Sequence, residues 1–182
     1  MKRGVLCLPI VMALSLGALA IELTSQNLLV VLEKEIGSKS NLGVKKFQHV
    51  WVETDIPDKL YEDALRIFAM RAGKILSGRT GIAVVYFVAN DNLTRGLVKA
   101  GIRIDTTKID QVAFTKFSDI QDLFVIAMFP VMDKYGNTQL DVVAIQYLTR
   151  ETFNKINWSL GLGAVSLFIE RAADFFWWDP EF

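Results

Sequence analysis

The chain has 182 residues, of which 52% are hydrophobic, and its 20 basic and 20 acidic side chains give a formal net charge of +0. This length is sufficient for one domain with a full hydrophobic core. No cluster of Lys and Arg stands out, which excludes a general affinity for nucleic acid or for anionic lipid, since both depend on a basic surface.

The single cysteine and the single histidine exclude several kinds of site. Cys7 lies near the start of the chain, and His49 is the sole histidine. A chain that begins after residue 20 would have no thiol for a disulfide, a nucleophile or a metal ligand. A zinc site or a Ser-His-Asp triad would depend on His49 alone. The sequence therefore predicts no catalytic residues, no metal and no cofactor, which favours a protein that is not an enzyme without deciding the question.

The segment 1–20 has the three parts of a secretory signal peptide. Lys2 and Arg3 provide a positive start, an apolar run follows, and small residues precede a cleavage site. Cleavage there would remove two basic residues and no acid, leaving an exported protein of net charge −2 in the periplasm or outside the cell. The alternative is an uncleaved membrane anchor, because the apolar run 5–22 approaches the roughly 20 residues that a bilayer span needs.

Residues 21–43 are predicted to form a helical arm and a linker before the domain. Apolar residues flanked by polar ones predict a helix over 26–36 with Ser25 as its cap, although such a short apolar run also suits a buried strand. Residues 37–43 are rich in Gly and Ser and predict the linker. The remaining residues, 44–182, are then a single domain.

Residues 47–90 predict a βαβ unit, the centre of the fold. Strands are expected over 47–54 and 81–90. Between them, 58–76 places apolar side chains on one helical stripe and charged side chains opposite, which is typical of a helix that packs on a sheet. Strands joined through a helix are expected to be parallel neighbours with a right-handed crossover.

Weaker patterns follow this unit. Asn92 and its neighbours cap a short helix that is expected to end at Gly101. Alternating residues predict an exposed strand over 102–105, and 111–117 predicts a second weak strand.

The clearest hairpin signal lies at 123–148. Two apolar arms flank the loop 133–137, and both arms are apolar on both faces, which places them centrally with other elements covering each side. Pro130 lacks an N–H group and so belongs near a strand end or a free edge.

The last segment predicts a long C-terminal helix from residue 150 to about residue 177, with Thr149 as its cap. No residue is charged over 158–169, which is typical of a helix that is buried on most sides. Gly161 and Gly163 offer a place where it would break in two. Together the segments predict an α+β domain with a mixed sheet of about five strands.

Two polar positions have a plain structural interpretation. His49 shares a strand face with Phe47, Trp51 and Glu53, where a histidine at the edge of an aromatic cluster is favoured over acid–base action with Glu53. The glycine-containing loop 77–81 runs from helix to strand, opposite in direction to a phosphate-binding loop, which favours a turn.

Acidic residues supply two further candidates. Asp141 and the loop 133–137 do not match the spacing of a calcium loop, which favours an ordinary hairpin loop. Four acids could converge as the carboxylate pair of a hydrolase, against the ordinary alternative of exposed loop acids. These four are Asp105, Asp110, Asp119 and Asp122.

The surplus of apolar side chains favours protein contact over chemistry. Large exposed apolar patches mark interaction sites, whereas the alternative is a single core between two helix layers. The candidate protein-contact residues are Phe175, Phe176, Trp177, Trp178 and Phe182.

We therefore expect an exported protein of the cell envelope, without enzymatic activity, that binds another protein or itself as an accessory part, a structural part or an inhibitor. The first alternative is a carboxylate-dependent hydrolase acting on an envelope polymer. The second is a membrane-anchored scaffold module, with membrane contact through residues 5–22.

Overall fold

The computed structural model describes residues 21–52, 80–92, 94–132 and 135–182. The predicted signal peptide, the predicted helix over 58–76 and Glu53 lie outside these residues. The elements in chain order are α1 (Ser25–Ile36), β1 (Phe47–Val52), β2 (Ile82–Val88), α3 (Arg95–Lys116), β3 (Asp122–Met132), β4 (Thr138–Thr149), α4 (Arg150–Lys155), the 3-10 turn η2 (Trp158–Leu160), α5 (Leu162–Ser166), α6 (Ile169–Ala172) and β5 (Phe175–Trp178).

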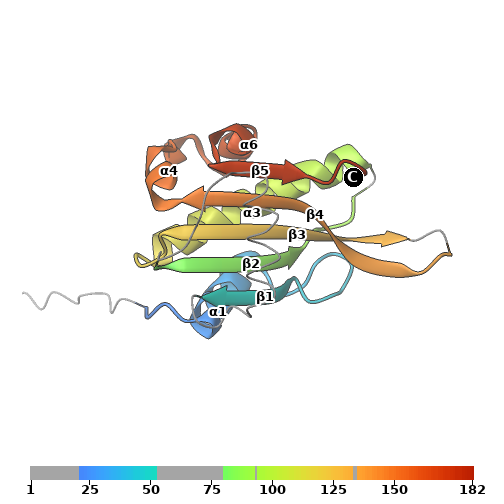
Figure 1. Ribbon diagram of the computed structural model, residues 1–182, viewed down its shortest axis with the longest axis horizontal. Helices are drawn as coiled ribbons and strands as arrows, with labels where there is room; N and C mark the ends of the chain where they lie inside the picture. The colour runs from blue at the N-terminus through green and yellow to red at the C-terminus, as the bar shows by residue number, and fades with distance from the viewer. Residues whose placement is uncertain (1–20, 53–79, 93, 133–134) are drawn as a thin grey trace, which may run out of the picture.

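The five strands form one mixed sheet in the order β1-β2-β3-β4-β5 (Figure 1). Among the described strands, only β2 and β3 are parallel, and the other neighbouring pairs are antiparallel. The predicted α+β class with a mixed sheet of about five strands is confirmed. The hairpin is also present, because β3 pairs with β4 along its whole length.

The predicted parallel pairing of the first two strands is wrong. β1 and β2 are neighbours, but they run antiparallel, with Val50 opposite Val85. The parallel pair is β2 with β3, and α3 connects them, so the βαβ order lies one strand further along the chain. A connection as long as the one between β1 and β2 allows the second strand to run parallel or antiparallel to the first. The side-chain pattern of the connection therefore does not determine the direction of β2.

One helix of 22 residues, α3, replaces the predicted short helix and two weak strands. Its buried residues include Ile102, Thr106, Ile109 and Ala113, which recur at helical spacing. Ile102 and Ile104 alternate with charged residues, which suggested a strand, but in the helix Ile102 is buried whereas Ile104 is 43% exposed. The predicted strands over this segment, and the helix end at Gly101, are therefore wrong.

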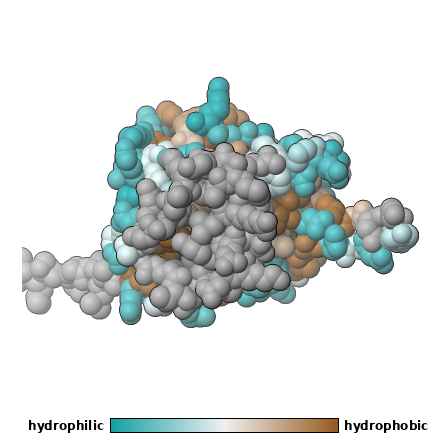
Figure 2. All heavy atoms as spheres, viewed as in Figure 1, coloured by the Kyte–Doolittle hydropathy of each residue, from teal (hydrophilic) through white to brown (hydrophobic). Residues whose placement is uncertain are grey.

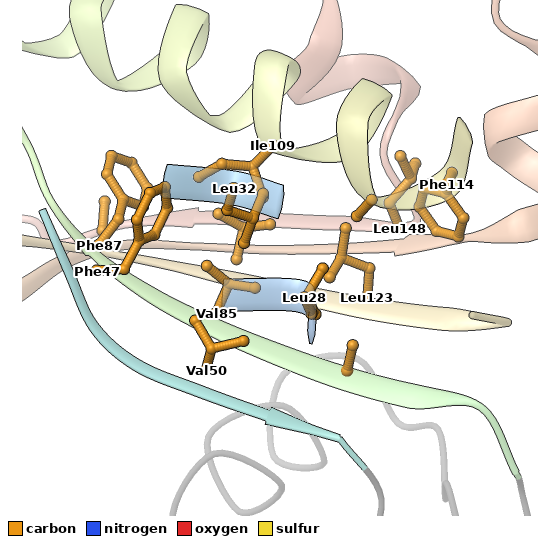
Figure 3. Close-up of a cluster of buried hydrophobic side chains, with 14 of the residues drawn as sticks. Leu28, Leu32, Phe47, Val50, Val85, Phe87, Ile109, Phe114, Leu123 and Leu148 are labelled. Carbon is orange, nitrogen blue, oxygen red and sulfur yellow. The ribbon is translucent and has the colours of Figure 1, made fainter. Parts of the chain in front are cut away.

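The main core lies between the sheet and the two helices α1 and α3, which contact each other on one face (Figure 3). The sequence predicts α1 as part of an arm before the domain, yet its Leu28 and Leu32 are fully buried in this core. They pack with side chains such as Phe47, Phe87 and Ile109.

The second face of the sheet carries its own apolar cluster, built from Ile82, Val84, Tyr86, Phe124, Ile126, Ile145 and Tyr147. Along β3, Leu123 and Val125 belong to the main core, whereas Phe124 and Ile126 belong to this second cluster. The central strands are thus buried on both faces, as their apolar sequences predict.

The predicted long C-terminal helix is wrong. Thr149 does cap a helix, since its hydroxyl accepts a hydrogen bond from the Thr152 N–H at 3.1 Å, but that helix, α4, ends at Lys155. Gly161 then adopts a φ of 82°, in the region that favours glycine, and the chain continues as α5, α6 and the edge strand β5. The uncharged segment folds as short helices, with Leu167 81% exposed.

Arg150 holds the end of α3 against the start of α4. Its guanidinium donates to the carbonyl oxygens of Ile120 at 2.8 Å, Phe114 at 2.9 Å and Phe117 at 2.6 Å, and it lies 4.8 Å from the centre of the Phe114 ring. Burial lowers the pKa of Arg150, while the nearby Asp119 raises it. The side chain thereby pairs carbonyl groups that the end of a helix leaves without partners.

Candidate functional site

His49 is the exposed residue of β1, the strand at one edge of the described sheet, and it lies within an aromatic cluster. Its ring stacks on Trp51 at 4.7 Å between centroids and meets the edge of Tyr86 at 6.0 Å. A bulge between Phe47 and His49 places Phe47 on the opposite face of β1, in the main core. The prediction that Phe47 shares a strand face with His49 is therefore wrong. The position of His49 agrees with the structural interpretation favoured by the sequence.

The four acids predicted as a carboxylate pair do not converge. Asp105 forms an ion pair with Lys46 at 2.8 Å, and Asp119 is exposed in the turn after α3. Asp122 is buried and accepts a hydrogen bond from the hydroxyl of Tyr147, whose ring belongs to the second cluster. Asp110 points instead into the main core from α3, as described next.

Asp110 and Gln146 form a buried polar pair between α3 and β4. The Gln146 amide donates to Asp110 Oδ2 at 2.6 Å, and the two residues are 0% and 1% exposed. Within the described part of the chain, Asp110 Oδ1 and Gln146 Oε1 have no hydrogen-bond partner. Burial raises the pKa of Asp110 to about 8 against the opposing effect of the Gln146 hydrogen bond, so the carboxyl is protonated at neutral pH.

A cleft of about 580 Å³ lies on the main-core side of the molecule. Three segments enclose it: the loop and first turn that begin α3, the outer part of the β3–β4 hairpin, and the C-terminal tail. Figure 1 shows these segments together, with the C-terminus beside the start of α3. Its floor is apolar, with Val98 and Val143 buried and the rings of Phe129 and Phe182 at 5.4 Å.

The rim of the cleft is acidic. Asp91, Asp141, Asp179 and Glu181 line it, and Arg95 is the single basic residue among the described residues of the lining. Asp141 accepts a hydrogen bond from the side chain of its neighbour Gln139 at 3.2 Å, and Asp179 accepts one from the Glu181 N–H at 2.7 Å. Among the described residues, no three His, Cys, Asp or Glu side chains are grouped so that they could hold a metal ion.

No protein-family model matches the chain, and neither a curated protein nor a solved structure matches it. The candidate site therefore depends on the geometry of the molecule itself. Across the described ranges, no helix has the length and hydrophobicity needed to cross a membrane.

The outer part of the hairpin projects from the sheet as a two-stranded ribbon (Figure 1). β2 pairs with β3 only as far as Met128, and β5 pairs with β4 only as far as Ala144, extended by a hydrogen bond from the Asp179 N–H to the Val143 carbonyl. Among the described strands, residues 129–132 and 138–142 therefore pair only with each other. Pro130 lies on this free part of β3, as its missing N–H predicts.

The ribbon is also apolar and exposed. Met132 and Tyr135 at its tip are 72% and 77% exposed. Where the ribbon leaves the sheet, Figure 2 shows hydrophobic surface on the face that is opposite the cleft, where Met128 and Val142 are partly buried. Exposed apolar side chains next to unpaired strand edges are typical of a surface that binds another chain.

The predicted protein-contact residues are mostly part of the sheet. Phe176 and Trp178 pack against the main core together with Phe182, whereas Phe175 and Trp177 pack against the second cluster. All five are partly buried, and only Phe182 lines the cleft.

Trp178 has further partners that account for its position. Its indole N–H donates to Glu170 at 2.9 Å, and the ammonium of Lys99 lies 5.0 Å from the centre of one of its rings. Arg103 also lies over the indole, at 5.5 Å, and pairs with Glu170. This arrangement joins the edge strand to α3 and α6.

Proposed function

We propose that this chain is an exported protein, without enzymatic activity, that acts by binding another protein as an accessory part, a structural part or an inhibitor in an envelope assembly. The observation that carries the proposal is the projecting β3–β4 ribbon, whose strand edges are unpaired among the described strands and whose apolar tip borders the acidic cleft. A strand with unpaired N–H and C=O groups readily accepts a strand from another chain.

The composition of the ribbon supports binding in preference to a purely structural role. A two-stranded ribbon is at best marginally stable on its own, and apolar side chains at its tip gain nothing by facing water. Contact with a second protein would bury Met132 and Tyr135, which are exposed in the isolated chain. The Pro130 edge has no N–H to offer at that position, which leaves the β4 edge better suited to a strand partner.

We expect a photoactivatable amino acid at Met132 to crosslink to a second protein in the cells that make this chain. Met132 is 72% exposed and belongs to the ribbon, so a bound partner would lie within reach of the probe. The same probe at Lys34, which is exposed on α1 at a distance from the ribbon in sequence and in the fold, provides the matched control. Mass spectrometry of the crosslinked band identifies the partner.

Two results would count against binding through the ribbon. One is a protein that is strictly monomeric after purification and yields no crosslinked band from either position. The other is equal crosslinking from Met132 and Lys34 to the same abundant proteins, which would indicate random collision rather than a specific contact.

Export is the second part of the proposal, and it depends on the segment 1–20. A positive start, an apolar run and small residues at a cleavage position support it. We expect the intact mass of the protein from its native host to correspond to a chain that begins at Ile21, recovered from the soluble fraction. A full-length chain found only in membranes would instead favour the membrane-anchored scaffold, with residues 5–22 as the anchor.

The hydrolase alternative has less support in the folded chain. The acids on which it depended are separated, with Asp110 in the main core and Asp122 beside the second cluster. The cleft does gather four other acids, but polar and apolar side chains line it together with them. Binding therefore accounts for this arrangement better than acid–base chemistry does.

A further inference from the structure

We infer that the cleft binds an extended segment of the partner protein in which a Lys or Arg side chain alternates with apolar side chains. This inference depends on the proposed function and specifies which chemistry the partner presents. It follows from three properties of the cleft, which are its charge, its apolar floor and the unpaired strand edge beside it.

The charge of the lining selects a basic partner. Four carboxylates, those of Asp91, Asp141, Asp179 and Glu181, line the cleft with one guanidinium, that of Arg95. The ammonium of Lys99 lies nearby, 5.8 Å from the centre of the Phe182 ring, so the acids still outnumber the cations. Complementary charge speeds encounter and suppresses wrong partners, because like charges placed together across an interface repel each other. A second copy of this chain would bring the same acidic rim, so self-association through the cleft is disfavoured.

The floor of the cleft selects apolar side chains next to the basic one. Val98 and Val143, which are 3% and 1% exposed, lie beneath the floor, and the partly exposed rings of Phe129 and Phe182 present the apolar surface that a partner would meet. The cleft volume of about 580 Å³ is within the usual range for ligand sites, roughly 300–1,000 Å³. A few side chains of a short segment fill such a space, whereas a folded domain does not.

The strand edge beside the cleft suits an extended backbone. β5 runs alongside β4 and ends at Trp178, and the tail then leaves the sheet at Pro180 after a last hydrogen bond from Asp179 to Val143. Next to it, residues 138–142 of β4 have no partner strand on that side among the described residues. A segment added here would continue the row of β5, and its alternate side chains would enter the cleft.

The test uses a fluorescein-labelled peptide of alternating Lys and Leu, six residues long, and a matched peptide of alternating Glu and Leu. Fluorescence anisotropy with the 21–182 chain measures binding of each. We expect the Lys-Leu peptide to bind at least tenfold more tightly than the Glu-Leu peptide. Because exposed charges are screened by salt, its affinity should fall as NaCl rises from about 0.05 to 0.5 M.

Charge-reversal variants separate the cleft from the general charge of the protein. Asp141→Lys and Glu181→Lys should each weaken binding of the Lys-Leu peptide at least fivefold. Glu35→Lys makes the same change of charge on an exposed residue of α1 and should change the affinity by less than twofold. NMR amide shifts on peptide addition should include Val98 and Val143 and leave α1 unaffected.

Equal binding of the two peptides, or equal weakening by Glu35→Lys and Asp141→Lys, would overturn the inference. Its failure is distinguishable from failure of the proposed function. Crosslinking from Met132 together with no preference for the Lys-Leu peptide would mean that a partner contacts the ribbon but does not enter the cleft.

Discussion

Replacing Asp110 by Asn should stabilise the protein at neutral and alkaline pH by several kcal/mol. The carboxyl is fully buried, and burial raises its pKa to about 8 from an ordinary value of 3.8. Asn keeps the shape of the side chain and cannot ionise. Its amide N–H also provides a donor next to Gln146 Oε1, which has no hydrogen-bond partner within the described part of the chain.

The direction of the pH dependence follows from the two protonation states. The unfolded chain releases the Asp110 proton near pH 3.8, whereas the folded chain retains it up to about pH 8. Between these values the folded state binds more protons, so the free energy of unfolding falls as the pH rises. The contribution of the protonated Asp110 carboxyl to the free energy of unfolding is fully present below pH 3.8 and is lost above about pH 8. At about 1.4 kcal/mol per pKa unit, the gap corresponds to roughly 6 kcal/mol.

Urea unfolding from pH 4 to pH 9, followed by tryptophan fluorescence, measures this difference. The free energy of unfolding of the Asn variant minus that of the wild type should grow from pH 4 to about pH 8 and then level off, because all other titrating groups are common to both proteins. Asp119→Asn makes the same chemical change on an exposed residue and should differ from the wild type by less than about 1 kcal/mol at every pH. Parallel curves for Asp110→Asn and the wild type would contradict an ionisation penalty at this position.

Asp110 also illustrates why sequence alone could not place the acids. In the printed sequence it directly precedes the second weak strand pattern, 111–117, and nothing nearby marks it as buried. Its burial depends on Gln146 of β4, 36 residues later, and on the fact that α3 is one continuous helix. Asp is usually exposed in folded proteins, so its residue type alone predicts an exposed position for Asp110, which is in fact buried.

The strands themselves were easier to predict than their directions. Alternating or continuous apolar residues mark β1, β2 and the hairpin in the sequence, and all of them are strands in the fold. Direction and order depend on long connections, which carry no local signal. The local sequence also does not distinguish helix from strand at β5, because its four aromatic residues suit a buried helix and a strand equally well. In the structure, Ala173 has an extended backbone that ends α6, and the chain continues as a strand.

The cleft could not be predicted because it joins distant segments. Its acidic rim comes from Asp91 in the loop before α3, from Asp141 in β4, and from Asp179 and Glu181 in the C-terminal tail, which are far apart in the sequence. In the sequence Asp91 resembles a helix cap and Asp141 an ordinary loop-side acid. Only the C-terminal aromatic residue Phe182, a predicted contact residue, belongs to both the predicted site and the cleft.

Replacing Gly81 by Ala should destabilise the fold by about 3–5 kcal/mol, combining backbone strain with a steric clash. Gly81 adopts a φ of 75°, and a Cβ at this position would lie 2.2 Å from the backbone oxygen of Asp119. Its own carbonyl accepts hydrogen bonds from the N–H groups of Gln121 at 2.8 Å and Asp122 at 3.2 Å. Because these bonds join the starts of β2 and β3, the parallel pair cannot shift away to relieve the clash.

Gly43 provides a matched control that separates strain from the clash. Its φ of 76° is nearly the same, but a Cβ there would have no atom within 4 Å. Gly43→Ala should therefore cost only the strain of a left-handed backbone, about 1–2 kcal/mol. Urea unfolding of the two variants at one pH measures the difference, which assigns the remaining loss to the close approach between Gly81 and Asp119. Equal losses in the two variants would mean that the start of β2 can move away from the turn after α3, and that the parallel β2–β3 pair is held less rigidly than its hydrogen bonds indicate.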